Sequence, residues 1–151
     1  MAADRYAVSV DISAKIEAWD KPSLVAVAND HTRVLLVTAA TKQEAARLLA
    51  NSEEPVQYAL MAVLAYLAVR HEIDHLSSIT LDRDYSGEIA ERIIVRRLLA
   101  LLKRDRPRLK SSAVRVGNVA NSKADRLARA AYKGKLKADG EITLAEIMAL
   151  L

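Results

Sequence analysis

The first third of the chain shows three short segments with strand-like patterns. Tyr6–Ser13 alternates apolar and polar residues, with Tyr, Val, Val and Ile at every second position, and this period of two is typical of a half-buried β-strand. Runs rich in Val, Leu and Ala follow at Ser23–Ala28 and Arg33–Ala39, with turn-forming residues at 29–32 between them. Because the connections are short, we predict an antiparallel meander of three strands.

The rest of the chain alternates helical and strand-like patterns. Thr41 followed by Glu44 has the spacing of a capping box, which predicts a helix to about Ala50. Residues 52–55 (Ser-Glu-Glu-Pro) predict the start of a second helix that ends near His71. The later predicted elements are strands Leu76–Leu81 and Ala113–Val119 and helices Glu88–Arg104, Lys123–Lys135 and Thr143–Leu150. This order predicts an α/β fold with a five-stranded mixed sheet and helices on both faces.

The amino-acid composition excludes several kinds of site and of catalysis. The chain of 151 residues is 52% apolar and contains no Cys, so disulfides, zinc-thiolate sites and thiol catalysis are excluded. No signal-peptide core follows the first residues, and no apolar run reaches the roughly 18 residues of a membrane span. We therefore expect a cytoplasmic protein with no membrane partner.

Three aspartates stand at positions that suit a ligand site. Asp11 lies within the first strand, Asp82 ends the fourth, and Asp125 lies in the first turn of the helix after the fifth. Ligands of α/β sheets collect beyond strand ends and at helix N-termini. Three carboxylates gathered there repel one another unless a cation neutralises them, and such oxygen ligands suit Mg²⁺ or Mn²⁺. The alternative is that each Asp merely caps a turn or compensates a helix dipole.

Four local motifs resemble the type I ribonuclease H family. Residues 121–131 (Asn-Ser-Lys-Ala-Asp-Arg-Leu-Ala-Arg-Ala-Ala) are similar to its C-terminal motif x-A/C-D-x-L-A-R-x-A. Residues 80–85 resemble its strand-end D-S-x-Y, with Arg83 in place of the usual Ser. Residues 6–13 resemble its first catalytic strand, and residues 56–61 its helix motif A-E-Y-x-A-L. The resemblance covers about residues 5–136 and implies one ribonuclease H-like domain, 1–151, with a C-terminal helical extension at 140–151.

The resemblance also implies a function. A member of this family would be a divalent-metal-dependent nuclease that hydrolyses phosphodiester bonds, with the RNA strand of RNA/DNA hybrids as the expected substrate. Asp11, Asp82 and Asp125 would hold the metal ions, and Gln57 stands where the family has a catalytic Glu. An amide keeps an oxygen ligand but lacks the charge, so one metal should bind more weakly. Glu54, one helical turn earlier on roughly the same face, is the alternative fourth ligand.

Two other differences from the family's sequence pattern are compatible with further functions. The Gly-rich segment that follows the first Asp in the family is replaced by residues 13–19, and the mobile His before its last Asp is absent, with Asn118 or Asn121 in that loop. One alternative is a catalytically weakened nucleic-acid-binding or scaffold domain. Another is an exonuclease or junction resolvase of the same superfamily, although residues 11–13 lack the exonuclease signature D-x-E.

Basic residues indicate a nucleic-acid partner. Eight of them lie between Arg92 and Lys110 against one acid, and Arg92, Arg96 and Lys103 have helical spacings that would let them hold a phosphate backbone. Lys123 and Arg126 flank Asp125 and could steer a phosphate towards it. The alternative is a solvated helix face that ends in a dipole-compensating basic turn. The apolar face of residues 142–151 would either dock on the domain or join two copies into a homodimer.

Overall fold

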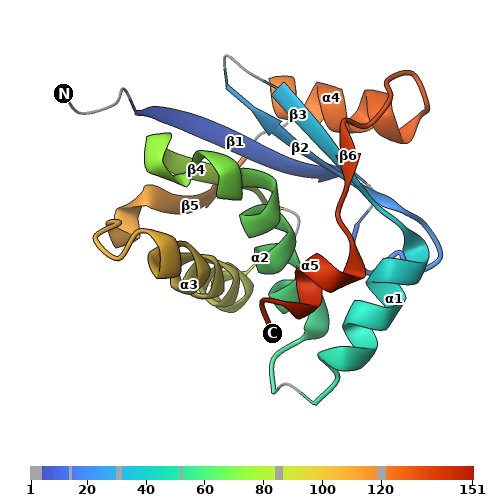
Figure 1. Ribbon diagram of the computed structural model, residues 1–151, viewed down its shortest axis with the longest axis horizontal. Coiled ribbons are helices and arrows are strands. Elements are labelled where there is room, and N and C mark those ends of the chain that lie inside the picture. Colours follow the sequence, from blue (N-terminus) through green and yellow to red (C-terminus); the bar gives the residue numbers. More distant parts are fainter. Residues whose placement is uncertain (1–4, 14, 30–31, 52, 84–86, 119–121) are drawn as a thin grey trace.

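The computed structural model describes residues 5–13, 15–29, 32–51, 53–83, 87–118 and 122–151. Within them, a six-stranded mixed sheet has the order β5-β4-β1-β2-β3-β6 (Figure 1). The strands are β1 (Tyr6–Ser13), β2 (Ser23–Ala28), β3 (Thr32–Val37), β4 (Leu76–Asp82), β5 (Val114–Gly117) and β6 (Gly140–Glu141). The first three pair antiparallel, whereas β4 is parallel to β1, β5 to β4 and β6 to β3. The predicted meander and mixed α/β sheet are confirmed, but the predicted strand number was wrong because β6 adds an edge strand.

Helices cover both faces of this sheet. They are α1 (Ala39–Leu48), α2 (Val56–Val69), α3 (Glu88–Asp105), α4 (Lys123–Tyr132) and α5 (Leu144–Met148), with 3₁₀ segments at Arg70–His75 and Ser111–Ala113. Helix α4 lies on one face against β1 and β2, and the other helices lie on the opposite face (Figure 1). None of the described helices is long and apolar enough to cross a bilayer.

The main core forms around α2. Every residue from Ala59 to Val69 is buried, as expected for a helix that is apolar on all sides. Helix α3 packs beside it through Ile94, Leu98 and Leu102, spaced four residues apart on one face. The opposite face of α3 therefore stays at the surface.

The core under α4 is smaller and built from small side chains. Its buried members are Leu24, Ala26, Ala28, Val34, Ala124 and Ala128. Alternate residues of β1 point to opposite faces of the sheet, as successive side chains of a strand do. Val10 and Ile12 enter the main core, so Asp11 between them faces α4.

The start of α1 differs from the sequence prediction. The side chain of Thr38 caps the helix and accepts a hydrogen bond from the Thr41 N–H at 3.1 Å. The predicted capping box at Thr41 is therefore wrong, and Glu44 instead pairs with Arg47. Thr38 is favoured as the cap because β3 ends at Val37, so it is the first residue outside the strand.

Lys42 in the first turn of α1 is 0% exposed. Its Nζ donates to the Ala18 carbonyl at 2.9 Å and to the Ser23 hydroxyl at 3.0 Å. Burial lowers the pKa of Lys42, and the nearby acids Asp20 and Glu17 only partly oppose this. The side chain thereby ties the β1–β2 connection to α1.

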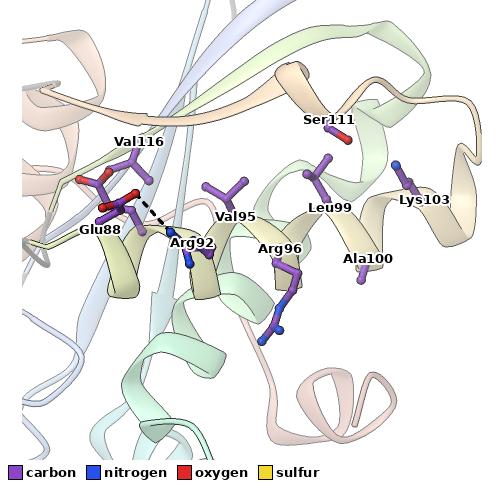
Figure 2. A pocket seen from close by; sticks show the side chains of 10 residues that line it. Glu88, Arg92, Val95, Arg96, Leu99, Ala100, Lys103, Ser111 and Val116 are labelled. Atoms are coloured by element: carbon purple, nitrogen blue, oxygen red, sulfur yellow. Dashed lines mark hydrogen bonds and ion pairs between the residues drawn. The ribbon is translucent and has the colours of Figure 1, made fainter.

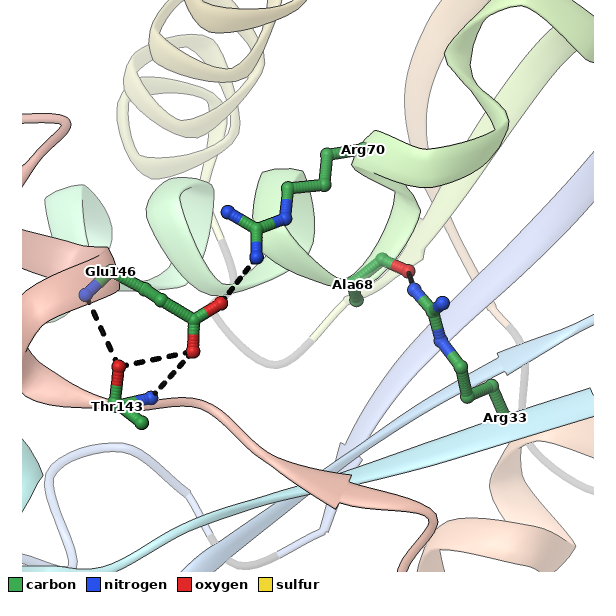
Figure 3. A network of polar contacts seen from close by, with 5 residues as sticks. All are labelled: Arg33, Ala68, Arg70, Thr143 and Glu146. Carbon is green, nitrogen blue, oxygen red and sulfur yellow. Dashed lines mark hydrogen bonds and ion pairs between the residues drawn. The ribbon is translucent and has the colours of Figure 1, made fainter.

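Residues 140–151 form part of the fold. Ile142 and Ile147 are buried in the main core, and α5 contacts α1 and α2. Thr143 and Glu146 form a capping box at its start. In the same region Arg70 pairs with Glu146, and Arg33 donates to the Ala68 carbonyl (Figure 3). Of the two predicted roles of this segment, docking on the domain is the one observed.

Three elements end earlier, or are shorter, than the sequence pattern predicts. Helix α2 ends at Val69, and the next six residues form a 3₁₀ segment. Strand β5 is shorter than predicted because residues 111–113 are 3₁₀, and Val119 lies outside the described residues. Helix α4 ends at Tyr132, where Gly134 with φ of 76° allows the left-handed turn that ends many helices.

Candidate active site

The structure brings two of the three predicted aspartates side by side. Val10 pairs with Leu81 in the parallel ladder between β1 and β4, and both side chains lie in the main core. Asp11 and Asp82 each follow one of these residues, so they lie on the opposite face of neighbouring strands. Adjacent strands are about 4.8 Å apart. The two carboxylates therefore share one small region of the face that α4 covers.

The third aspartate lies on the helix that packs over this face. Asp125 is in the first turn of α4, where its N–H donates to the Ser122 hydroxyl at 3.2 Å. Helix α4 contacts both β1 and β2. Asp11 is 4% exposed and Asp125 is 8% exposed. Buried carboxylates require a cation or several hydrogen-bond donors, because losing their hydration is costly.

Arg129 supplies one positive charge at this place. It lies one helical turn after Asp125, and its guanidinium nitrogens lie 3.2 and 3.3 Å from the two carboxylate oxygens. The i, i+4 spacing could have indicated this pair from the sequence. Asp125 is thus already partly neutralised by the chain itself.

The described residues do not complete a metal centre. Among them, no three His, Asp or Glu side chains converge closely enough to hold one metal ion. The three-aspartate metal site therefore stays a prediction, with two members adjacent and the third on the covering helix.

The two predicted fourth ligands have different surroundings. Gln57 lies in the first turn of α2 and is partly exposed. Glu54 accepts from Arg97 Nε at 2.8 Å and also pairs with Arg96. These contacts hold Glu54 towards α3, so a ligand role for Glu54 would require breaking two ion pairs. Gln57 remains the residue predicted as the fourth ligand. Of the two predicted loop residues, Asn118 is exposed, and Asn121 lies outside the described residues.

Three of the predicted phosphate-binding residues line a groove along α3. Arg92, Arg96 and Lys103 border an open groove of about 610 Å³ whose floor includes the apolar residues Val95 and Leu99 (Figure 2). Arg92 pairs with Glu88 at 3.2 Å, and Arg96 pairs with Glu54. Acids of the same surface therefore offset part of the positive charge of this groove.

The other two predicted phosphate-binding residues lie across the sheet. Lys123 and Arg126 are exposed on α4, and the Lys123 Nζ lies 3.5 Å from the Asn29 carbonyl. The five basic residues thus form two separate surfaces, and only Lys123 and Arg126 share a helix with Asp125. A sequence does not show this division, because it depends on which face each helix covers.

Comparisons with known proteins give no family for this chain. Neither protein-family models, nor curated proteins, nor solved structures gave a match. The chain has an antiparallel β1-β2-β3 meander followed by the parallel strands β4 and β5, an arrangement compatible with ribonuclease H-like topology.

Proposed function

We propose that the chain is a divalent-metal-dependent nuclease of the ribonuclease H type that hydrolyses phosphodiester bonds. The RNA strand of an RNA/DNA hybrid is the substrate we expect. The observation that carries the proposal is that Asp11 and Asp82 directly follow the paired residues Val10 and Leu81 of two neighbouring parallel strands, with the helix that bears Asp125 packed over β1.

The donor set suits a hard divalent cation. Asp11, Asp82 and Asp125 offer only carboxylate oxygens, the ligands that Mg²⁺ and Mn²⁺ prefer. A cation between the two strand carboxylates would relieve their repulsion. When bound, such an ion supplies an activated water and stabilises the negative charge of the phosphoryl group.

The chain's own residues would position the substrate. Asp11 pairs with Ala26 of β2, whereas Asp82 ends its strand, pairs with Gly117 of β5 and is more exposed. Lys123 and Arg126 are exposed on the helix of Asp125, and their charge would attract a phosphate backbone to this surface. Gln57 would contribute an uncharged oxygen, so we expect slower catalysis than a Glu at that position would give.

Cleavage of a labelled RNA/DNA hybrid with Mg²⁺ or Mn²⁺ tests the proposal. We expect metal-dependent cleavage that falls at least about a hundredfold in Asp82→Asn, because a metal ligand is lost. Asp74→Asn, which changes an exposed aspartate before β4, should keep the wild-type rate. Equal rates in the two variants would contradict the assignment of Asp82.

One alternative has a specific observation behind it. Gln57 lacks the charge of a catalytic Glu, and Arg129 already pairs with Asp125; both favour a nucleic-acid-binding domain with weakened chemistry. Gln57→Glu separates the two functions, because restored charge should raise the cleavage rate of a nuclease. Binding without cleavage of hybrid, single-stranded or branched substrates, in wild type and in Gln57→Glu, would establish the alternative.

A further inference from the structure

A second charged region lies at the opposite end of β4 from Asp82. Here a hollow of about 280 Å³ opens between the start of β4 and the connection from α3 to β5. Its described lining contains four cationic side chains, two hydroxyl groups and no carboxylate. These polar residues are Arg5, Ser77, Arg106, Arg108, Lys110 and Ser112.

The wall of this hollow is held in place by the fold. Arg106 Nη1 donates to the carbonyls of Ile73 at 3.0 Å and Leu76 at 2.6 Å, which fixes its guanidinium against the start of β4. Leu109 and Ala113 are buried, and their N–H groups close two turns at 3.0 Å onto the carbonyls of Arg106 and Lys110. The segment that carries Arg106, Arg108 and Lys110 is therefore held against the start of β4.

The charge balance of the hollow differs from that of the α3 groove. In the groove, Arg92 and Arg96 pair with Glu88 and Glu54. The hollow has no acidic residue in its described lining. The nearby carboxylate of Asp105 accepts a hydrogen bond from the hydroxyl of Tyr66 on α2. Like charges gathered without a counter-charge raise the local positive potential and attract an anion.

We propose that this hollow binds the phosphate group of a phosphorylated ligand. Guanidinium forks match the geometry of phosphate oxygens, and Lys and Ser add further donors. The volume is below the roughly 300–1,000 Å³ of pockets that enclose a whole drug-sized ligand. The hollow therefore accepts a phosphate group and little of the molecule that carries it.

This site is separate from the proposed nuclease centre. Ser77 and Asp82 are five residues apart on β4, which corresponds to about 16 Å along a strand. The test can therefore be made in the Asp82→Asn variant without divalent metal, so that its outcome does not depend on cleavage.

Binding of inorganic phosphate, measured by calorimetry against chloride of equal ionic strength, tests the proposal. We expect saturable binding that weakens about tenfold or more when Arg108 and Lys110 are both changed to Ala, because two charge-assisted contacts are lost. The matched control is the double variant Lys133→Ala, Lys135→Ala, which removes the same charge from an exposed segment after α4 and should bind phosphate as before. Equal weakening in both double variants, or no binding beyond that of chloride, would overturn the site.

Two further titrations identify the source of the phosphate. If a nucleoside monophosphate binds and its affinity depends on Arg108 and Lys110, the site takes a free phosphorylated molecule. If only an RNA/DNA hybrid depends on them, with a salt slope that falls by about one to two in the variant, the site holds a backbone phosphate. Independence of both ligands from these two residues would count against the proposal.

Discussion

Two buried titratable side chains affect stability at alkaline pH in opposite directions. Tyr66 on α2 donates its hydroxyl to Asp105 at the end of α3, and burial followed by this bond raises the pKa of Tyr66 to about 12. Lys42 is buried without a carboxylate among its hydrogen-bond acceptors in the described chain, and burial lowers its pKa. The two groups therefore change the free energy of unfolding in different pH ranges.

The Tyr66 contribution should disappear between about pH 10 and 12. Its folded-state pKa of about 12 lies above the ordinary value of 10.0, so the stabilisation is complete below pH 10 and is lost as pH rises through the folded-state value. Two pKa units correspond to roughly 2–3 kcal/mol. Urea unfolding of Tyr66→Phe should lack this decline, whereas Tyr132→Phe, at an exposed tyrosine of α4, should retain it. An unchanged decline in Tyr66→Phe would show that the titration of Tyr66 is not its cause.

Lys42 should produce the opposite slope at lower pH. Because its folded-state pKa lies below 10.5, the unfolded chain binds more protons, and stability should rise as pH rises towards 10.5. Below pH 10 Tyr66 makes no opposing contribution. Lys42→Met should therefore flatten the slope there. Lys21→Met, which removes an exposed lysine, should leave the slope unchanged, and a flat slope in the wild type would contradict the burial of a titrating amine.

At the scale of elements, α5 should contribute to global stability. Ile147 is 0% exposed in the main core, whereas Met148 next to it is 50% exposed. Ile147→Ala should cost about 2–5 kcal/mol of the free energy of unfolding, because it leaves a cavity between α5 and the core. Met148→Ala should cost well under half as much, as expected for a surface position. Urea denaturation of both variants measures the difference, and equal costs would mean that α5 does not dock in solution.

The elements with a clear period could be predicted from sequence, and short ones could not. The bounds of β1 and β2 agree with their apolar patterns, because alternation and burial follow directly from strand geometry. Strand β6 has two residues, too few for any period, and it exists because Asp139 and Ile142 donate to the carbonyls of β3. Thr38 and Thr41 could both cap α1, and the choice depends on where β3 ends.

The candidate site likewise has features that the sequence could predict and features that it could not. The adjacency of Asp11 and Asp82 could be expected from their places on two strands of one sheet. The contact of Glu54 with Arg96 and Arg97 joins residues more than 40 positions apart, so it depends on how α2 and α3 pack. The convergence of Arg5 with residues 106–112 likewise depends on the pairing of β1 with β4.

At the scale of the whole molecule, α4 is the layer held by the smaller core. Ala26, Ala28, Ala124 and Ala128 bury little apolar surface compared with the Leu, Ile and Val side chains under α2 and α3, and stabilisation scales with the apolar area removed from water. Helix α4 also carries Asp125. If α4 moved so that Asp125 reached a cation held by Asp11 and Asp82, that ion would link the less firmly held layer to the sheet.

This arrangement predicts that the proposed metal site stabilises the fold only when metal is present. In EDTA, Asp82→Asn should be more stable than wild type by about 1 kcal/mol, because two neighbouring carboxylates no longer repel. With Mg²⁺ at a hundredfold excess over its dissociation constant, the wild type should gain about 2.7 kcal/mol, and Asp82→Asn should gain much less. Hydrogen exchange should place the added protection of the wild type in α4, and Asp74→Asn should behave as wild type in both conditions. If Mg²⁺ stabilised Asp82→Asn as much as the wild type, the ion would bind elsewhere, and the carboxylate pair would have to be explained by hydrogen bonding alone.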